Sequence, residues 1–279
     1  MLARYQSVEI NIDILSRQYF YFDKPVPYYL TPENSINIYP VSVLDSEIFV
    51  NSIELFTIDK NSSPSVEIIQ MPYLDFIIKI LFQNSLNIDR FINLMKICLQ
   101  IEKIKLDVDE KEHILIKDQN GNIINHKHFD NIKKIILYQN IIEYNEDYIS
   151  PELKEAMQET DALKNKNIDL PNLERRIAII TAHCGLSKKD QLSMSYRSHS
   201  LLFKEIHDEV EYTVTKPIAI FNGKKIDSWF YPTKTDILDK YIMDKDKFIK
   251  SFGAEDSNIS TIVSNTNKSN YDQMFKQFK

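Results

Sequence analysis

The stretch NLERRIAIITAHCGLSKKDQLSMSYRSH, residues 172–199, decides how the C-terminal half of the chain folds. Residues 172–184 have the apolar spacing of a helix, and Gly185 then supplies the left-handed residue that commonly ends one. Ser187 is placed to cap a second, short helix, and Ser195 to cap a third, longer one. The sequence therefore predicts a mainly helical C-terminal half.

The same stretch imitates a DNA-reading helix-turn-helix in its order of helix, Gly-Leu-Ser turn and short helix. In that motif an apolar residue falls six positions after the glycine, and here Gln191 takes that place, with Leu192 one later. Local positive charge comes from Arg175, Arg176, Lys188, Lys189 and Arg197. We favour a helical hairpin in which Leu186 and Leu192 fill the core; a DNA-binding regulator using residues 172–200 is the alternative.

The first 60 or so residues have the pattern of strands. Short runs of alternating isoleucine, valine, tyrosine and phenylalanine are separated by prolines, and seven aromatic residues precede residue 30. After Glu67 the apolar spacing becomes helical and predicts two helices, over 72–83 and 88–101. We therefore expect a β-rich N-terminal part followed by two helices.

The centre of the chain, HILIKDQNGNIINH at residues 113–126, predicts a β-hairpin. Asn120-Gly121 stands between two apolar runs, and the pair is typical of a type I′ turn, whose central residues both need φ > 0. The acidic run DVDEKE at 107–112 is interpreted as a solvated connection, and residues 130–140 predict a helix.

Three further segments are expected beyond residue 150. The tripeptide Ser150-Pro151-Glu152 predicts the start of a helix over 151–167. Most of this helix is charged, so we expect it to be exposed or to depend on a partner. After Pro217 the pattern returns to short strands, with Asn222-Gly223 as a turn and Trp229 in the closing strand. Serine, asparagine, threonine and lysine then predominate in a polar tail.

The predicted fold class is α+β. The β-rich part and its two helices occupy residues 1–105, the hairpin and a helical domain occupy 106–250, and a flexible polar tail occupies 251–279. Cys98 and Cys184 are the only thiols, and their isolation favours two reduced cysteines over a disulfide.

Composition and charge exclude several classes of protein. Four glycines are too few for a glycine-rich phosphate loop or a dinucleotide fingerprint. A net charge of −6 lacks the positive field that sequence-independent binding to nucleic acid requires. The chain has neither an apolar signal-peptide run nor a stretch of about 18 apolar residues, so we expect a cytoplasmic protein without membrane contact.

No motif identifies a catalytic or metal centre. His126 and His128 are spaced to share one face of a strand and to hold a metal, but no third ligand is identifiable. His199 and His207 share one helix face, and the chain has neither a G-x-S-x-G elbow nor a Cys-His signature. We therefore expect no enzyme, no cofactor and no metal; a hydrolase built on scattered acids and histidines is an alternative that predicts retained metal.

Four residues are candidates for binding another protein. Tyr28, Tyr29 and Trp229 are aromatic, and aromatic anchors dominate the energy of many interfaces. Lys154 lies on the charged helix predicted over 151–167. The competing interpretation is that the aromatic residues fill the core.

A resemblance to a known family rests on several segments taken together: the β-rich N-terminal segment, SVEIIQMPYLDFIIKIL, IILYQN, YISPELKEAMQE, TAHCGLSKKDQLSMSYRSHSLLFKEIHDEVEY and the closing strand with Trp229. Over residues 30–235 the chain resembles the chaperone-like tail or baseplate hub assembly proteins of large tailed bacteriophages. The resemblance implies a non-catalytic factor in the host cytoplasm that binds a tail, hub or tape-measure protein. Many such chaperones are shorter, so a structural baseplate component is a further alternative.

Overall fold

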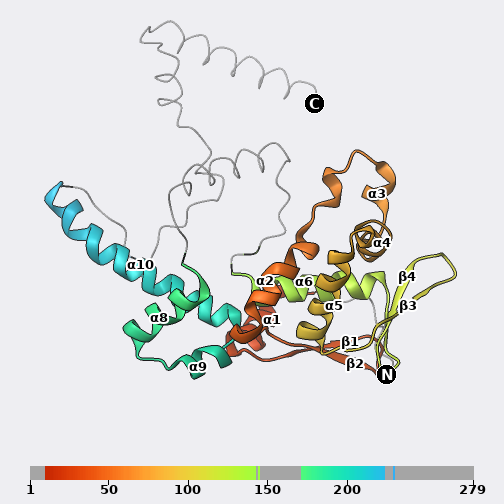
Figure 1. Ribbon diagram of the computed structural model, residues 1–279, viewed down its shortest axis with the longest axis horizontal. Coiled ribbons are helices and arrows are strands. Elements are labelled where there is room, and N and C mark those ends of the chain that lie inside the picture. The colour runs from red at the N-terminus through yellow and green to blue at the C-terminus, as the bar shows by residue number, and fades with distance from the viewer. Residues whose placement is uncertain (1–9, 143, 145–170, 224–228, 230–279) are drawn as a thin grey trace, which may run out of the picture. The chain divides into compact units, whose positions relative to one another are not determined.

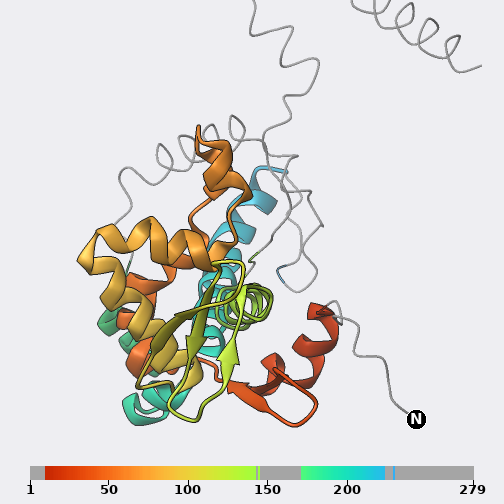
Figure 2. The same ribbon diagram turned by 90° about the vertical axis from the view of Figure 1, so that its right-hand side faces the viewer.

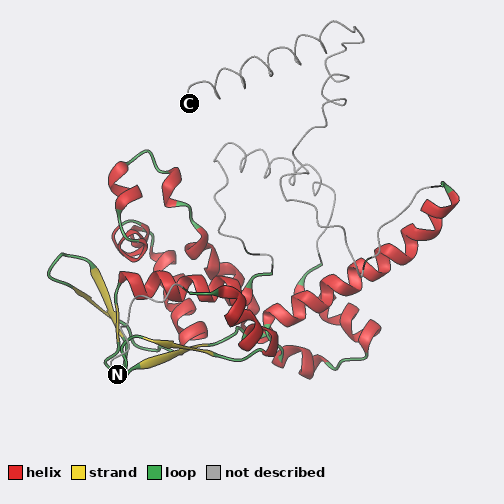
Figure 3. Ribbon diagram, turned by 180° about the vertical axis from the view of Figure 1, so that it is seen from behind, coloured by secondary structure: helices red, strands yellow, loops and turns green. Residues whose placement is uncertain are grey.

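The computed structural model describes residues 10–142, 144, 171–223 and 229 of the chain. Helices predominate, and the strands form two small antiparallel sheets (Figure 1, Figure 3). The predicted α+β class with a helical C-terminal half is confirmed. One sheet is a hairpin and the other has three strands in sequence order; the strands are β1 (Val26–Tyr29), β2 (Ser35–Ile38), β3 (Lys105–Val108), β4 (Ile114–Lys117) and β5 (Ile123–Ile124).

The N-terminal part contains two helices besides its β1–β2 hairpin. Helix α1 (Ile12–Gln18) precedes β1, and α2 (Ser46–Thr57) follows β2. The buried apolar residues of α2 are Phe49, Leu55 and Phe56, whose spacing places them on one helix face. This part of the chain is therefore less β-rich than predicted, because burial of a helix face outweighs the strand propensity of single residues.

The two helices predicted after Glu67 are confirmed in place. A short helix α3 (Val66–Gln70) leads to α4 (Tyr73–Lys79), and α5 (Ser85–Leu99) ends where Gln100 adopts a left-handed φ of 56°. Helix α6 (His126–Asn140) begins earlier than the predicted residue 130. The reason is its cap: the Asn125 side chain accepts a hydrogen bond from the His128 N–H at 3.0 Å.

One hydrophobic core joins these elements. Helix α2 packs on α5, and α4 packs on α6. Helix α6 also contacts β2 and β5, and Figure 2 shows it beside the three-stranded sheet to which β5 belongs. Phe129 of α6 lies between two other rings, 5.5 Å from that of Phe56 and 6.1 Å from that of Phe91. This core includes residues on both sides of position 105, where the sequence placed a domain boundary. The division of the chain into two compact units falls after Lys224.

The acidic run at 107–112 forms the end of strand β3 and the turn to β4. The Asp109 side chain accepts hydrogen bonds from the N–H groups of Lys111 and His113, and Glu112 adopts a left-handed φ of 62°. The interpretation of this run as a solvated connection was wrong for residues 107 and 108, which belong to strand β3. All four residues of this edge strand are exposed, so no buried alternation marks it in the sequence.

The hairpin predicted at Asn120-Gly121 is confirmed as the β4–β5 pair, but its turn type is not. Only Gly121 has a positive φ, of 82°, whereas a type I′ turn requires it of both residues. The Asp118 side chain stabilises the turn instead. Its carboxylate accepts hydrogen bonds from the N–H groups of Asn120 and Asn122.

In the described residues from 171 to 223, the C-terminal half contains α8 (Leu173–Cys184), α9 (Lys188–Ser193) and α10 (Tyr196–Phe221). The predicted end of α8 and the predicted starts of α9 and α10 are confirmed: Gly185 ends α8 with a φ of 69°, and Ser187 and Ser195 cap the two helices that follow. Helix α10 packs on α8 and α6.

The strands predicted after Pro217 were wrong as far as Phe221, because α10 continues through that proline. Proline removes one N–H donor, and at about one turn from the helix end the loss of a single bond does not stop the helix. Asn222 and Gly223 end α10. Trp229 lies half-buried in a turn.

Two predicted segments, the helix over 151–167 and the tail over 251–279, lie outside the described residues. Within the part of the chain that the structure describes, no helix is long and apolar enough to span a bilayer. Both cysteines are free, with Cys98 buried and Cys184 exposed.

Candidate functional site

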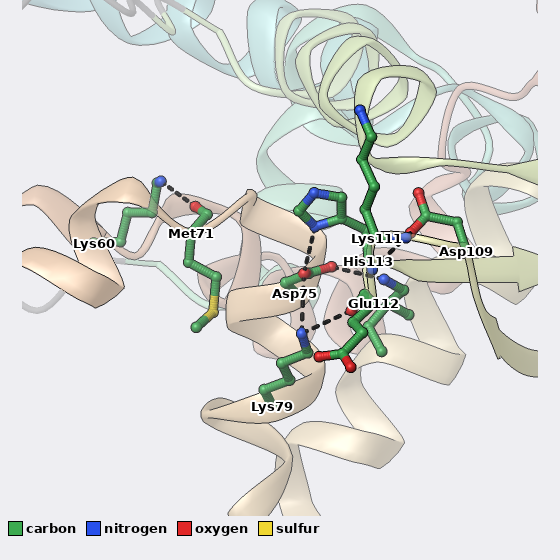
Figure 4. Close-up of polar contacts among 9 residues, drawn as sticks. Lys60, Met71, Asp75, Lys79, Asp109, Lys111, Glu112 and His113 are labelled. Carbon is green, nitrogen blue, oxygen red and sulfur yellow. Dashed lines mark hydrogen bonds and ion pairs between the residues drawn. The ribbon is translucent and has the colours of Figure 1, made fainter.

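A buried polar cluster joins α4 to the β3–β4 turn (Figure 4). Its centre is the carboxylate of Asp75, a residue that is 1% exposed. This carboxylate accepts hydrogen bonds from the Ile114 N–H at 2.9 Å, from His113 Nδ1 at 3.1 Å and from Lys79 Nζ at 3.2 Å. Lys79 also donates to the carbonyl oxygen of Glu112 at 3.0 Å, so one cluster fixes the turn to the helix.

Asp75 is held in its ionised form. Burial alone raises the pKa of a carboxyl group, but the hydrogen bonds from Ile114, His113 and Lys79 outweigh burial and lower the pKa of Asp75 below its usual value. Because an ionised carboxylate only accepts hydrogen bonds, His113 must carry its proton on Nδ1. The other nitrogen of His113, Nε2, then has a free lone pair when the ring is neutral.

The two histidines that the sequence paired, His126 and His128, have separate contacts. His128 Nδ1 lies 3.0 Å from the Tyr28 hydroxyl. The ring of His126 instead lies near His113, with 5.0 Å between the ring centroids, and its Nδ1 is buried without a hydrogen-bond partner. The two side chains do not share a face, because both residues belong to the first turn of α6, where positions two apart point in different directions. The favoured interpretation, two exposed histidines where a strand leads into a helix, is right about the place, but both side chains are half-buried.

The helices α8, α9 and α10 form a second candidate site, and Gln191 holds its first two helices together. Its side chain is fully buried, and Nε2 donates to Thr181 Oγ1 at 2.9 Å and to the carbonyl oxygen of Leu186 at 3.1 Å. The predicted core residues Leu186 and Leu192 are only half-buried. An amide therefore fills the position where a helix-turn-helix has an apolar residue.

Replacing Gln191 with alanine is expected to lower the free energy of unfolding by about 1–3 kcal/mol, because the buried carbonyl oxygen of Ile177 and the partly buried acceptors of Thr181 and Leu186 lose their donor. Urea unfolding followed by far-UV circular dichroism measures the change. Gln119→Ala, which removes an exposed glutamine with a single hydrogen bond to Gln100, is the control and should change stability by less than about 0.5 kcal/mol. Equal losses in the two variants would contradict the assigned role.

His199 of α10 makes stability depend on pH. The residue is 1% exposed and its Nε2 has no partner. Burial, and then the positive charge of Arg176, lower the pKa of His199 below the usual 6.5. The unfolded chain therefore binds the proton first on acidification, so stability is full above pH 6.5 and falls as the pH drops toward the folded-state pKa.

We expect the melting temperature to fall between pH 7.5 and pH 5.5, and His199→Leu to reduce that fall. Differential scanning calorimetry at the two pH values measures both proteins. The same pH dependence in the variant as in the wild type would show that another group causes it.

An apolar groove of about 400 Å³ lies between α8 and α10. Ile179 of α8 and Phe203, Ile206, Val210 and Val214 of α10 line it. Toward the C-terminal end of α10 the apolar side chains on this face are exposed. Val214 is 59% exposed, and Ile218 and Phe221 are also exposed. The sequence does not mark this face, because buried and exposed apolar residues of one helix recur with the same spacing.

Polar side chains flank the groove. His207, Glu211 and Thr215 are part of its lining. Helix α10 carries four acidic side chains in this region, Glu205, Asp208, Glu209 and Glu211, against two lysines, Lys204 and Lys216. Among the described residues, His207, Asp208 and Glu211 also bring their ligand atoms within 4.8 Å of one another.

Three of the four predicted partner-binding residues belong to the described part of the chain, and their surroundings differ. Tyr28 is half-buried, and its hydroxyl contacts His128 and accepts a hydrogen bond from Asn131 at 3.1 Å, so it ties β1 to α6. Tyr29 is 59% exposed. Trp229 is half-buried, and Lys154 lies outside the described residues.

Two of the basic residues considered for DNA reading are engaged inside the protein. Arg176 lies over the Phe203 ring, and Arg197 donates to the carbonyl oxygen of Tyr138 at the end of α6 at 3.0 Å.

Comparisons with protein-family models, with curated proteins and with solved structures found no match.

Proposed function

We propose that this protein is a non-catalytic protein-binding factor that takes a helix of its partner into the groove between α8 and α10. The observation that carries this proposal is the exposed apolar stripe of Val210, Val214 and Ile218, spaced four residues apart on one helix. Exposed apolar side chains at this spacing are typical of surfaces that bind an amphipathic helix.

The charges beside the groove define the partner's chemistry. Because acidic side chains outnumber lysines on this part of α10, the complementary partner helix has an apolar stripe flanked by lysine or arginine. The β-branched residues of the groove need no ordering of long side chains on binding, which lowers the entropic cost of association.

The partner we propose is a phage tail, hub or tape-measure protein, bound in the host cytoplasm during assembly. The resemblance to tail and hub assembly proteins supports this identity. The exposed groove supports the mode of action, since a factor of this kind covers an apolar helix of a subunit until that helix is incorporated.

The test is an affinity capture of the tagged full-length protein from its native expression setting, after nuclease treatment and washing at high salt. Mass spectrometry should identify one dominant tail or baseplate protein that contains a basic amphipathic helix. An apolar interface persists at high salt, whereas contacts to phosphates weaken steeply. If nucleic acid were the only captured species, and were captured only at low salt, the proposal would be overturned in favour of the DNA-binding regulator.

A further inference from the structure

We propose that His113 and His126 together bind a divalent transition-metal ion of the zinc class. The site joins the β3–β4 turn to the first turn of α6, and it is independent of the groove between α8 and α10. It departs from the expectation that the protein holds no metal. The juxtaposition is tertiary: the two rings come from different elements and lie 5.0 Å apart, centroid to centroid.

This separation fits two imidazoles on one metal ion. A Zn–N bond of about 2.0–2.1 Å places each ring centroid roughly 3.2 Å from the metal, and tetrahedral geometry then puts the two centroids about 5.2 Å apart. The observed 5.0 Å agrees with that figure. Imidazole nitrogen is also a preferred ligand of zinc, copper and nickel ions.

Each ring has a nitrogen available. His126 Nδ1 is buried and has no hydrogen-bond partner, an arrangement that costs free energy unless a ligand satisfies it. His113 uses Nδ1 for the Asp75 carboxylate, and its other nitrogen points away from that carboxylate (Figure 4). The lone pairs of His126 Nδ1 and His113 Nε2 are therefore the two we assign to the metal.

Asp75 has the role of the outer carboxylate in this arrangement. Histidines that bind metals commonly donate their second ring N–H to a carboxylate, which fixes the tautomer and makes the coordinating nitrogen more basic. The Asp75–His113 contact at 3.1 Å has this form.

The surrounding charge also suits a cation. Asp109 lies in the same turn as His113, and its carboxylate accepts a hydrogen bond from the His113 N–H at 2.9 Å. Asp75 and Asp109 thus supply two negative charges against the one ammonium group bonded to Asp75, that of Lys79. The remaining coordination positions go to water.

Zinc titration of the untagged full-length protein, cleared of metal beforehand, tests the site by isothermal calorimetry. We expect one Zn²⁺ per chain and a higher melting temperature with Zn²⁺ present, because a ligand that binds the folded state stabilises it. His113→Ala and His126→Ala should each weaken Zn²⁺ binding at least tenfold. His126→Ala is the cleaner variant, since its Nδ1 makes no hydrogen bond whose loss would disturb the fold.

Two controls separate this site from other zinc ligands on the surface. His207→Ala removes the histidine of the exposed His207, Asp208 and Glu211 group, and Cys184→Ser removes the exposed thiol. Both should bind Zn²⁺ as the wild type does. The absence of stoichiometric binding in the wild type, unchanged binding in His126→Ala with its fold intact by circular dichroism, or loss of binding in either control would each overturn the proposal.

Discussion

Replacing Asp75 with alanine is expected to lower the free energy of unfolding by about 2–4 kcal/mol, because the change leaves a buried donor without its acceptor and opens a small cavity. The Ile114 N–H loses its 2.9 Å hydrogen bond, and the contacts of the carboxylate with His113 and with Lys79 are lost together with it. Urea unfolding at pH 7 followed by circular dichroism measures the difference.

Asp107→Ala is the matched control for this prediction. Asp107 is also paired with a lysine, Lys117, but both side chains are substantially exposed, so water screens the pair and its loss should change stability much less than the loss of Asp75. Similar losses in the two variants would show that burial of Asp75 is not what makes its contacts important.

The effect of Asp75 should also depend on pH. Its pKa is lowered in the folded state, so its stabilising contribution is complete above the unfolded-state value near 4 and declines as the pH falls toward the folded-state pKa. The difference in stability between the wild type and Asp75→Ala should therefore narrow on acidification below about pH 4. A difference that stays constant there would contradict the ionised state assigned to Asp75.

The second large effect is expected for partner binding. The double variant Val210→Asp, Val214→Asp should reduce recovery of the captured partner at least tenfold, which corresponds to about 1.4 kcal/mol or more of binding free energy. Each aspartate places an unpaired charge where an apolar helix would exclude water. Both valines are about half exposed or more, so the fold itself should tolerate the change.

Thr213→Asp supplies the control, because it adds the same side chain next to Val214 at an exposed position outside the groove lining. It should capture the partner as the wild type does. If the double variant kept full capture, or if Thr213→Asp lost it equally, the groove would not be the binding surface.

Local signals in the sequence predicted the helical half well. The caps at Ser187 and Ser195 and the stop at Gly185 all have partners within a few residues, and the structure has each of them where the sequence placed it. The helix rows of α5 and the hairpin at Gly121 are of the same kind. Such features are readable because the donor, the acceptor and the required backbone angle lie in one short segment.

Signals without a local cause were missed or misjudged. Strand β3 has no buried face, so only its pairing with β4 makes it a strand. Gln191 was treated as a departure from an apolar pattern, although it is the fully buried residue that joins α8 and α9. In α10 the apolar residues recur at helical spacing, but the neighbouring helices decide that Ile206 is buried and that Val210 is exposed.

The sequence by itself determined the fold class, the end of α8, the starts of α9 and α10 and the central hairpin, since each depends on residues close together in the chain. Only the tertiary structure decided which polar residues meet. His126 was paired by sequence with His128 but lies against His113, and Asp75 finds the Ile114 N–H 39 residues away. Contacts of that separation leave no periodicity in the sequence, because they form only when packing of the core brings the elements together.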